Sequence, residues 1–142
     1  MVKKKERKPV LKGWTQRIKG GCGNIYSVIN EDIVDGTKQL YESFIRLGKS
    51  GGCAAAFCEA LGRSVSIGLS HGIPLQEYAE QFRGIQCHKA LGDVGSCPDG
   101  ISKMFELILI MIEKEKKIEE VKEDVKKREE EVKNKDEKKA ST

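Results

Sequence analysis

Apolar and polar residues alternate in the first third of the chain, in a pattern typical of strands. Residues 14–18 and 25–29 each predict a strand, and residues 40–47, with Tyr41, Phe44 and Ile45, predict a third. A glycine-rich turn over residues 20–24 separates the first two, and a second turn is predicted from 31 to 36. Three consecutive strands joined by short turns indicate an antiparallel meander.

The pattern changes to a helical period after residue 51. Apolar residues at i, i+3, i+4 spacing predict a helix to about residue 71, with a buried stripe of Ala54, Phe57, Cys58, Leu61, Val65 and Leu69. Pro74 starts a shorter helix over 75–82. After a loop over 84–97, Pro98-Asp99 opens a last helix. We therefore expect an α+β fold, with a three-stranded antiparallel sheet followed by helices packed on one face.

Residues 113–139 continue this last helix as a charged extension, in which acidic residues precede basic ones by four positions. These pairs are Glu113–Lys117, Glu123–Lys127, Asp124–Arg128, Glu129–Lys133 and Glu131–Lys135. Each adds about 0.2–0.5 kcal/mol to an isolated helix. Apolar residues also recur at 3-4 spacing, so two interpretations stay open: a solvated single helix that frays near its end, or a weak coiled coil that joins two copies or a partner.

Charge divides the 142 residues into three parts. The net charge of +4 comes from a basic, flexible arm at residues 1–12, because 13–112 are nearly neutral and the tail at 113–142 is balanced. No apolar run approaches the roughly 20 residues that span a bilayer, and the basic N-terminus lacks the apolar core of a secretory signal. We expect a cytoplasmic protein without membrane contact, whose five cysteines are not paired in disulfides.

Four of the cysteines lie next to turns or predicted helix starts: Cys22, Cys53, Cys87 and Cys97. Helix N-termini favour thiolates, and four thiolates form a closed, tetrahedral site of the structural zinc type. The spacing is not that of a CxxC pair, and an iron–sulfur cluster is the other metal that the cysteines allow. His88 could replace Cys87 as a ligand, whereas Cys58 belongs to the apolar stripe and is predicted to be a core residue.

Four motifs in a fixed order carry a family resemblance. They are Gly21-Cys22-Gly23-Asn24-Ile25-Tyr26, Gly48-Lys49-Ser50-Gly51-Gly52-Cys53, Gly72-Ile73-Pro74 and Gly95-Ser96-Cys97-Pro98-Asp99-Gly100. With them, the chain from about Pro9 to Leu109 resembles the TSCPD domain, which occurs at the C-terminus of vitamin B12-dependent (class II) ribonucleotide reductases and as short free-standing proteins. Gly95 stands where the name motif has threonine, but all four family cysteines are present.

The resemblance implies a free-standing accessory module of a ribonucleotide reductase, a ribonucleoside-diphosphate reductase of deoxyribonucleotide synthesis and DNA replication. Its implied partner is the reductase catalytic chain, and its implied metal ligands are the same four cysteines. The full-length reductases use adenosylcobalamin, but their catalytic barrel, radical cysteine and cobalamin site have no counterpart in this sequence. We therefore expect no catalytic residues and no enzyme activity from the chain alone.

Two other functions are open from the sequence. The basic arm, residues 3–12, could contact the phosphates of a nucleic acid, with Trp14 or Tyr26 stacking on bases, in a zinc-bearing nucleic-acid-binding module. Alternatively, Cys87 and Cys97 could act in thiol redox chemistry or metal delivery, because thiolates near helix starts are reactive.

Overall fold

The computed structural model describes residues 4–48 and 51–141, in two units that comprise residues 1–108 and 109–142. The elements are β1 (Lys12–Gly20), β2 (Gly23–Val34), β3 (Thr37–Leu47), α1 (Gly52–Ser70), α2 (Leu75–Phe82) and α3 (Cys97–Ala140). Residues 1–3 of the predicted arm and Lys49-Ser50 of the second motif lie outside the described residues. In the described ranges, no helix combines the length and the apolar character needed to cross a bilayer.

The three strands form one antiparallel sheet in the order β1-β2-β3, which confirms the predicted meander. The second turn is shorter than predicted, because β2 continues through Val34 and only Asp35 and Gly36 connect it to β3. Both residues have positive φ, 50° and 77°, as the tight hairpin turn of an Asp-Gly pair requires. A register shift at Asn30/Glu31 lets the pairing extend to this turn.

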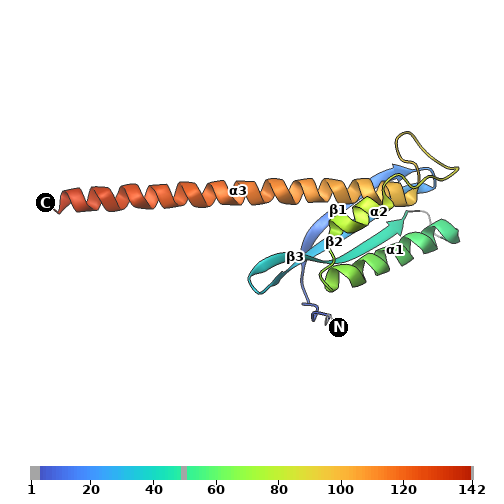
Figure 1. Ribbon diagram of the computed structural model, residues 1–142, viewed down its shortest axis with the longest axis horizontal. Coiled ribbons are helices and arrows are strands. Elements are labelled where there is room, and N and C mark those ends of the chain that lie inside the picture. Colours follow the sequence, from blue (N-terminus) through green and yellow to red (C-terminus); the bar gives the residue numbers. More distant parts are fainter. Residues whose placement is uncertain (1–3, 49–50, 142) are drawn as a thin grey trace. The chain divides into compact units, whose positions relative to one another are not determined.

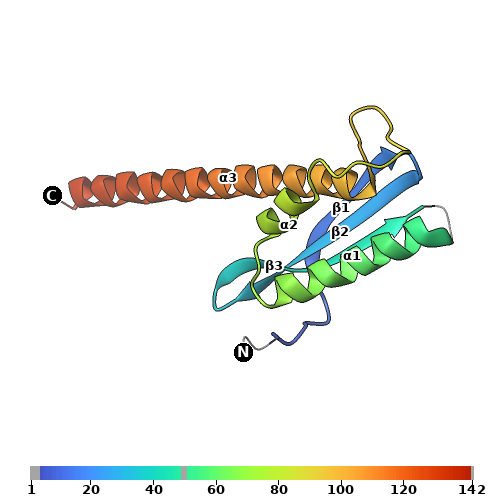
Figure 2. The same ribbon diagram turned by 45° about the vertical axis from the view of Figure 1, so that its right-hand side comes forward.

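Helix α1 lies beside β3 at the edge of the sheet (Figure 2). The Ser66 hydroxyl accepts the Ser43 N–H at 2.8 Å and donates to the Ser43 carbonyl at 2.6 Å. One turn earlier, a Cβ at Gly62 would lie 2.8 Å from the Ile45 backbone nitrogen, so only glycine lets the helix approach this closely. Small residues on α1 thus cover backbone groups of β3 that would otherwise be an unpaired sheet edge.

The core lies between one face of the sheet and the helices of the first unit, namely α1, α2 and the first turns of α3, as predicted (Figure 1). Its fully buried side chains include Ile25 and Ile29 from β2 and Ile101, Phe105 and Ile108 from α3. The predicted stripe on α1 was wrong at one position. Phe57 is 71 % exposed, because the side chains that face the core are Cys58, Val65 and Leu69, with Gly62 between them.

The short helix α2 is tied to the first turns of α3. The ring centroids of Phe82 and Phe105 lie 6.3 Å apart, and the buried Ser102 hydroxyl donates to the Ala79 carbonyl at 2.7 Å. A further ion pair joins Arg83 to Glu106. These contacts fix the position of the part of α3 that belongs to the first unit.

The N-terminal segment places several of its basic side chains against residues of its own sheet. The Arg7 guanidinium makes two 2.8 Å hydrogen bonds to Glu42, Lys8 lies 2.6 Å from Asp32, and Lys5 donates to Gln39. The Arg7 hydrogen bond is the main reason that the pKa of Glu42 is lowered. Part of the positive charge of this segment is therefore neutralised within the molecule.

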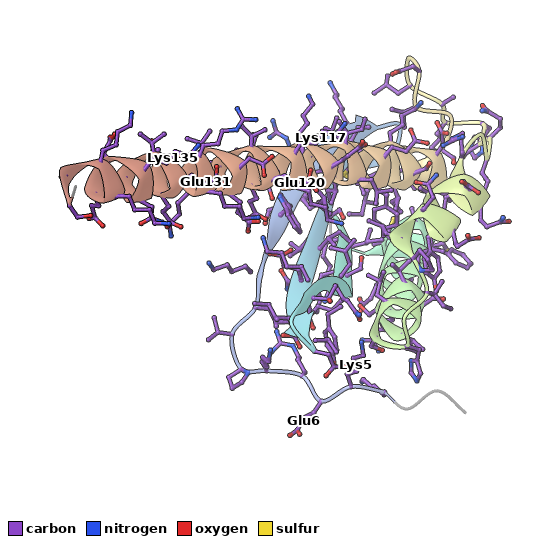
Figure 3. The ribbon with its side chains drawn as sticks, turned by 60° about the vertical axis from the view of Figure 1, so that its left-hand side comes forward. Lys5, Glu6, Lys117, Glu120, Glu131 and Lys135 are labelled. Carbon is purple, nitrogen blue, oxygen red and sulfur yellow. The ribbon has the colours of Figure 1, made fainter. Side chains whose placement is uncertain are left out.

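The second unit consists of the remainder of α3, in which no described residue is buried. Charged side chains such as Lys117, Glu120, Glu131 and Lys135 project from this part of the helix in Figure 3. The predicted pair Glu113–Lys117 forms, with a separation of 2.9 Å. The long charged helix expected from the sequence is thus confirmed.

Candidate metal centre

The segments that carry the predicted cysteine ligands gather at one end of the sheet, where β1 ends and β2 begins (Figure 2). Cys22 lies in the turn between these strands, and Cys53 is the second residue of α1. The end of β3 that leads to α1 pairs with the start of β2, through Gly48 N–H and the Asn24 carbonyl at 2.7 Å. Segments far apart in the sequence therefore meet here.

The start of α3 is built by four consecutive residues, Ser96, Cys97, Pro98 and Asp99. The Ser96 hydroxyl accepts the Asp99 N–H at 3.1 Å, which is the N-cap interaction of a helix. Pro98 is in the first turn, where its missing N–H costs nothing. Cys97 is consequently held at a defined position at the helix start.

The Asp99 carboxylate connects this helix start to both ends of the preceding loop. It accepts the Gly84 N–H at 2.8 Å and the Gly95 N–H at 2.9 Å. Burial raises the pKa of Asp99, but these two N–H groups and the Lys103 ammonium outweigh burial and leave its pKa below the ordinary value. One buried carboxylate thus closes the loop that contains Cys87.

The same loop rests on the turn that contains Cys22. A Cβ at Gly21 would lie 1.6 Å from the Lys89 carbonyl oxygen, so no larger residue can occupy this position without moving the loop. Within the loop, Cys87 N–H donates to the Gly95 carbonyl at 2.9 Å. The Cys22 turn and the Cys87 loop are therefore packed directly together.

The pKa of the Cys97 thiol is affected by two other cysteines, Cys22 and Cys58. Burial, followed by the neighbouring sulfurs of Cys58 and Cys22, raises the pKa of the Cys97 thiol to about 12. At Cys97, burial and the two neighbouring thiols therefore act against the thiolate that a helix start was expected to favour. A thiol that is protonated at neutral pH is also a poor nucleophile, which weakens the redox hypothesis for Cys97.

The other two predicted ligands are exposed. Cys53 lies in the first turn of α1, and the Cys87 sulfur is 3.8 Å from Nδ1 of the adjacent His88. Within residues 4–48 and 51–141, no three or more cysteine, histidine or acidic side chains are arranged so that they could hold a metal ion. The structure thus brings together Cys22 and Cys97 but does not bring Cys53 and Cys87 into a set with them.

Sequence reasoning missed the role of Cys58 in this cluster. Its thiol is only 1 % exposed and interacts with Cys97, although it was assigned to the core. The assignment to the core was right, because the residue is buried. This burial is also the main cause that raises the pKa of the Cys58 thiol. Nothing in its spacing distinguished it from the apolar residues of α1, so no signal in the sequence could have placed it beside Cys97.

Comparison with known proteins gives one result for the family and one for the fold. The family model of the TSCPD domain matches residues 2–109, which is most of the chain and includes all five cysteines. No solved structure matches the chain. The match ends one residue after the first structural unit, so the helical tail lies almost wholly outside it.

Proposed function

This chain belongs to the TSCPD domain family, a domain associated with ribonucleotide reductases, and we propose that it is a free-standing accessory module of such a reductase. In this role it docks on the reductase catalytic chain and holds a structural metal ion. The single observation that carries the proposal is the family match over residues 2–109. In this proposal the contribution of the 142 residues is binding rather than chemistry.

For the metal we propose zinc, with Cys22, Cys53, Cys87 and Cys97 as ligands. The donor chemistry fits, because sulfur ligands are those that zinc prefers in structural sites. The contact of Cys22 with Cys97 supports the set, and so does the packing of the Cys87 loop on the Cys22 turn. Cys53 and Cys87 are exposed and would have to move inward, which makes their recruitment the step to test.

A bound cation would stabilise the thiolate form of its cysteine ligands. It would join the β1–β2 turn, the start of α1, the loop over 84–96 and the start of α3. Such a staple contributes most to a small domain, whose core alone gives limited stability.

Metal analysis of the purified protein with single cysteine substitutions tests this site. We expect about one zinc per chain, lost in each of Cys22→Ala, Cys53→Ala, Cys87→Ala and Cys97→Ala. Cys58→Ala is the matched control and should retain the metal. Loss of zinc in Cys58→Ala together with full retention in Cys53→Ala would overturn the ligand set, and a visible iron–sulfur chromophore would overturn the choice of zinc.

Docking is tested separately by gel filtration of the full chain mixed with the catalytic chain of a class II ribonucleotide reductase from the same source. Co-elution that is lost in the metal-free protein supports both parts of the proposal. A zinc-loaded protein that elutes apart from the reductase at every concentration excludes docking and leaves the metal site intact.

A further inference from the structure

The face of the sheet that points away from the helices is open to solvent. Two adjacent rows of residues cross it in register: Arg17, Tyr26 and Arg46, then Thr15, Val28 and Phe44. Tyr26 is 38 % exposed and Phe44 is 48 % exposed. Large aromatic side chains on the solvent side of a sheet are unusual, and here they occupy its central strand and a neighbouring strand.

The two rings are diagonal neighbours, since Tyr26 lies opposite Arg46 and Phe44 is two residues before it. Diagonal neighbours on a sheet are about 7–8 Å apart, within reach of each other for aromatic side chains. Gly48 leaves room for the Tyr26 ring, because a Cβ there would lie 3.0 Å from Tyr26 Cε2. The face therefore offers two adjacent flat apolar surfaces.

Positive charge surrounds these rings. Arg17 and Lys19 are exposed on β1, and neither forms an ion pair in the part of the chain that the structure describes. The acid in the next row of this face, Glu42, is balanced by the Arg7 ion pair and also accepts a hydrogen bond from the Asn30 amide. The face thus has a surplus of positive charge.

The positive surface continues past β3 towards α1. Arg46 and Arg63 share a single carboxylate, Glu59, at 2.6 Å each, so this pair of arginines also keeps one uncompensated charge. A groove of about 480 Å³ runs here between β3 and α1, lined by Phe44, Ile67 and both arginines. Phe44 and Arg46 therefore belong both to the open face of the sheet and to this groove.

We propose that this face binds single-stranded nucleic acid, with bases stacked on Tyr26 and Phe44 and phosphates on Arg17, Lys19 and Arg46. Stacking on exposed aromatic rings within a positively charged groove is the general mode of single-strand recognition, and it tolerates any base sequence. The site differs from the N-terminal arm, and it is a function beyond docking on a reductase.

Charge distinguishes this occupant from a protein partner. The buried centre of a protein interface is depleted of charged residues. Here Arg17 and Arg46 flank Tyr26 in its row, and Phe44 is two residues from Arg46 on the same strand. A polyanion gains from these charges, whereas an apolar protein surface would have to desolvate them.

Fluorescence anisotropy of the full chain with labelled oligothymidylate and oligouridylate of equal length tests the proposal. We expect Tyr26→Ala with Phe44→Ala to weaken binding at least about tenfold, since each stacked base contributes. Phe57→Ala, which removes an exposed ring on α1, is the matched control and should bind like the wild type. Far-UV circular dichroism confirms that all variants are folded, as expected for exposed positions.

Charge variants give a second, independent readout. Arg17→Glu with Lys19→Glu should lower the salt dependence of binding, by about 0.7 in the log–log slope for each phosphate that the variant no longer neutralises. Lys122→Glu with Lys126→Glu makes the same charge change in the second unit, outside the proposed site, and should lower the slope by less. Lys4→Ala tests whether the N-terminal arm binds instead of the sheet. Binding through the sheet should be retained in this variant.

Three results would overturn the proposal. The first is wild-type protein that binds neither oligonucleotide between about 50 and 200 mM salt. The second is the same affinity in the double ring variant and the wild type. The third is a loss of binding in Lys4→Ala together with unchanged binding in the double ring variant. Comparison of the two oligonucleotides then shows whether DNA or RNA is preferred.

Discussion

Helix α3 belongs to both units of the molecule, and its two parts are stabilised by different forces. In residues 97–108, Ile101, Phe105 and Ile108 are fully buried, and Asp99 and Ser102 form hydrogen bonds to other segments. From residue 109 onward no described residue is buried, and Val121, Val125 and Val132 are about half exposed or more. The same backbone conformation is therefore fixed by tertiary packing in one part and by local side-chain pairs in the other.

The two parts of α3 show that a helix can be predicted from a sequence for two different physical reasons. The charged tail forms a helix because its residues have high intrinsic helix propensity and acid–base spacing of four, which need no partner. The first turns contain Pro98 and Gly100, which are poor helix formers, and they are helical because the core and the cap hold them. Substitutions should accordingly cost much in one part and little in the other.

Phe105→Ala should give the largest effect. Removal of a fully buried ring that packs 6.3 Å from Phe82 should lower the free energy of unfolding by about 3–5 kcal/mol. Val125→Ala on the same helix is the control and should change it by less than about 0.5 kcal/mol. Urea denaturation followed by Trp14 fluorescence measures both, and similar losses in the two variants would contradict the division of α3.

Asp99→Ala should cost about 2–3 kcal/mol, because the N–H groups of Gly84 and Gly95 lose their acceptor. Asp136→Ala makes the same change in the exposed part of α3 and should be nearly neutral. Hydrogen exchange by NMR gives a local readout, in which the Gly84 and Gly95 amides lose protection in Asp99→Ala alone. Unchanged protection of these amides would contradict the role of Asp99 in closing the loop.

Glu42→Gln removes the carboxylate of the shielded ion pair with Arg7, for comparison with an exposed pair in the tail. Because the Arg7 hydrogen bond lowers the pKa of Glu42, its stabilisation is present above the unfolded pKa of about 4.3 and is lost as pH falls through the lower folded pKa. We expect a loss of about 1 kcal/mol at neutral pH that disappears towards about pH 2. Urea midpoints measured across this pH range give the comparison.

The control for this pair is Glu113→Gln, which removes an exposed partner of Lys117 in the tail. It should leave the urea midpoint unchanged at every pH, because solvent screens a pair in which both side chains are about two-thirds exposed. An equal pH dependence in both variants would contradict the comparison.

Deletion of residues 113–142 should give the smallest effect. We expect the unfolding of the first unit to change by less than about 0.5 kcal/mol, although the helical signal in circular dichroism falls strongly. Analytical ultracentrifugation of the same protein tests whether the tail joins two copies, since any association of the wild type should be absent after deletion. A loss of several kcal/mol would show that the tail contributes to the core.

Most of the fold could be predicted from the sequence, because it depends on local signals. Alternation indicated the three strands, and Pro74 indicated the start of the helix at Leu75. The extension of β2 to Val34 could not be predicted, because polar residues such as Glu31 and Asp32 are typical of turns and are held in the strand only by pairing. The exposure of Phe57 was missed because the position of β3 decides which face of α1 is buried.

For the cysteines, the sequence indicated which segments carry them but not which thiols lie near one another. Glycines and helix starts marked Cys22 and Cys97, each of which influences the other's surroundings, whereas no local pattern marked Cys58, whose thiol also acts on Cys97. Tyr26 was named from the sequence as a residue that could stack on bases, but its pairing with Phe44 on one face was missed for the same reason. Tyr26 and Phe44 become neighbours only through the register of β2 and β3.

The connections within the sheet also bear on the order in which the domain assembles. Two-residue turns join β1 to β2 and β2 to β3, so the sheet forms from contacts between consecutive segments and should fold early. The thiols of Cys22 and Cys97 are far apart in the sequence of the first unit, and their meeting requires closure of a long loop. During synthesis the cysteine end is therefore completed last, and its thiols are exposed until the start of α3 has left the ribosome.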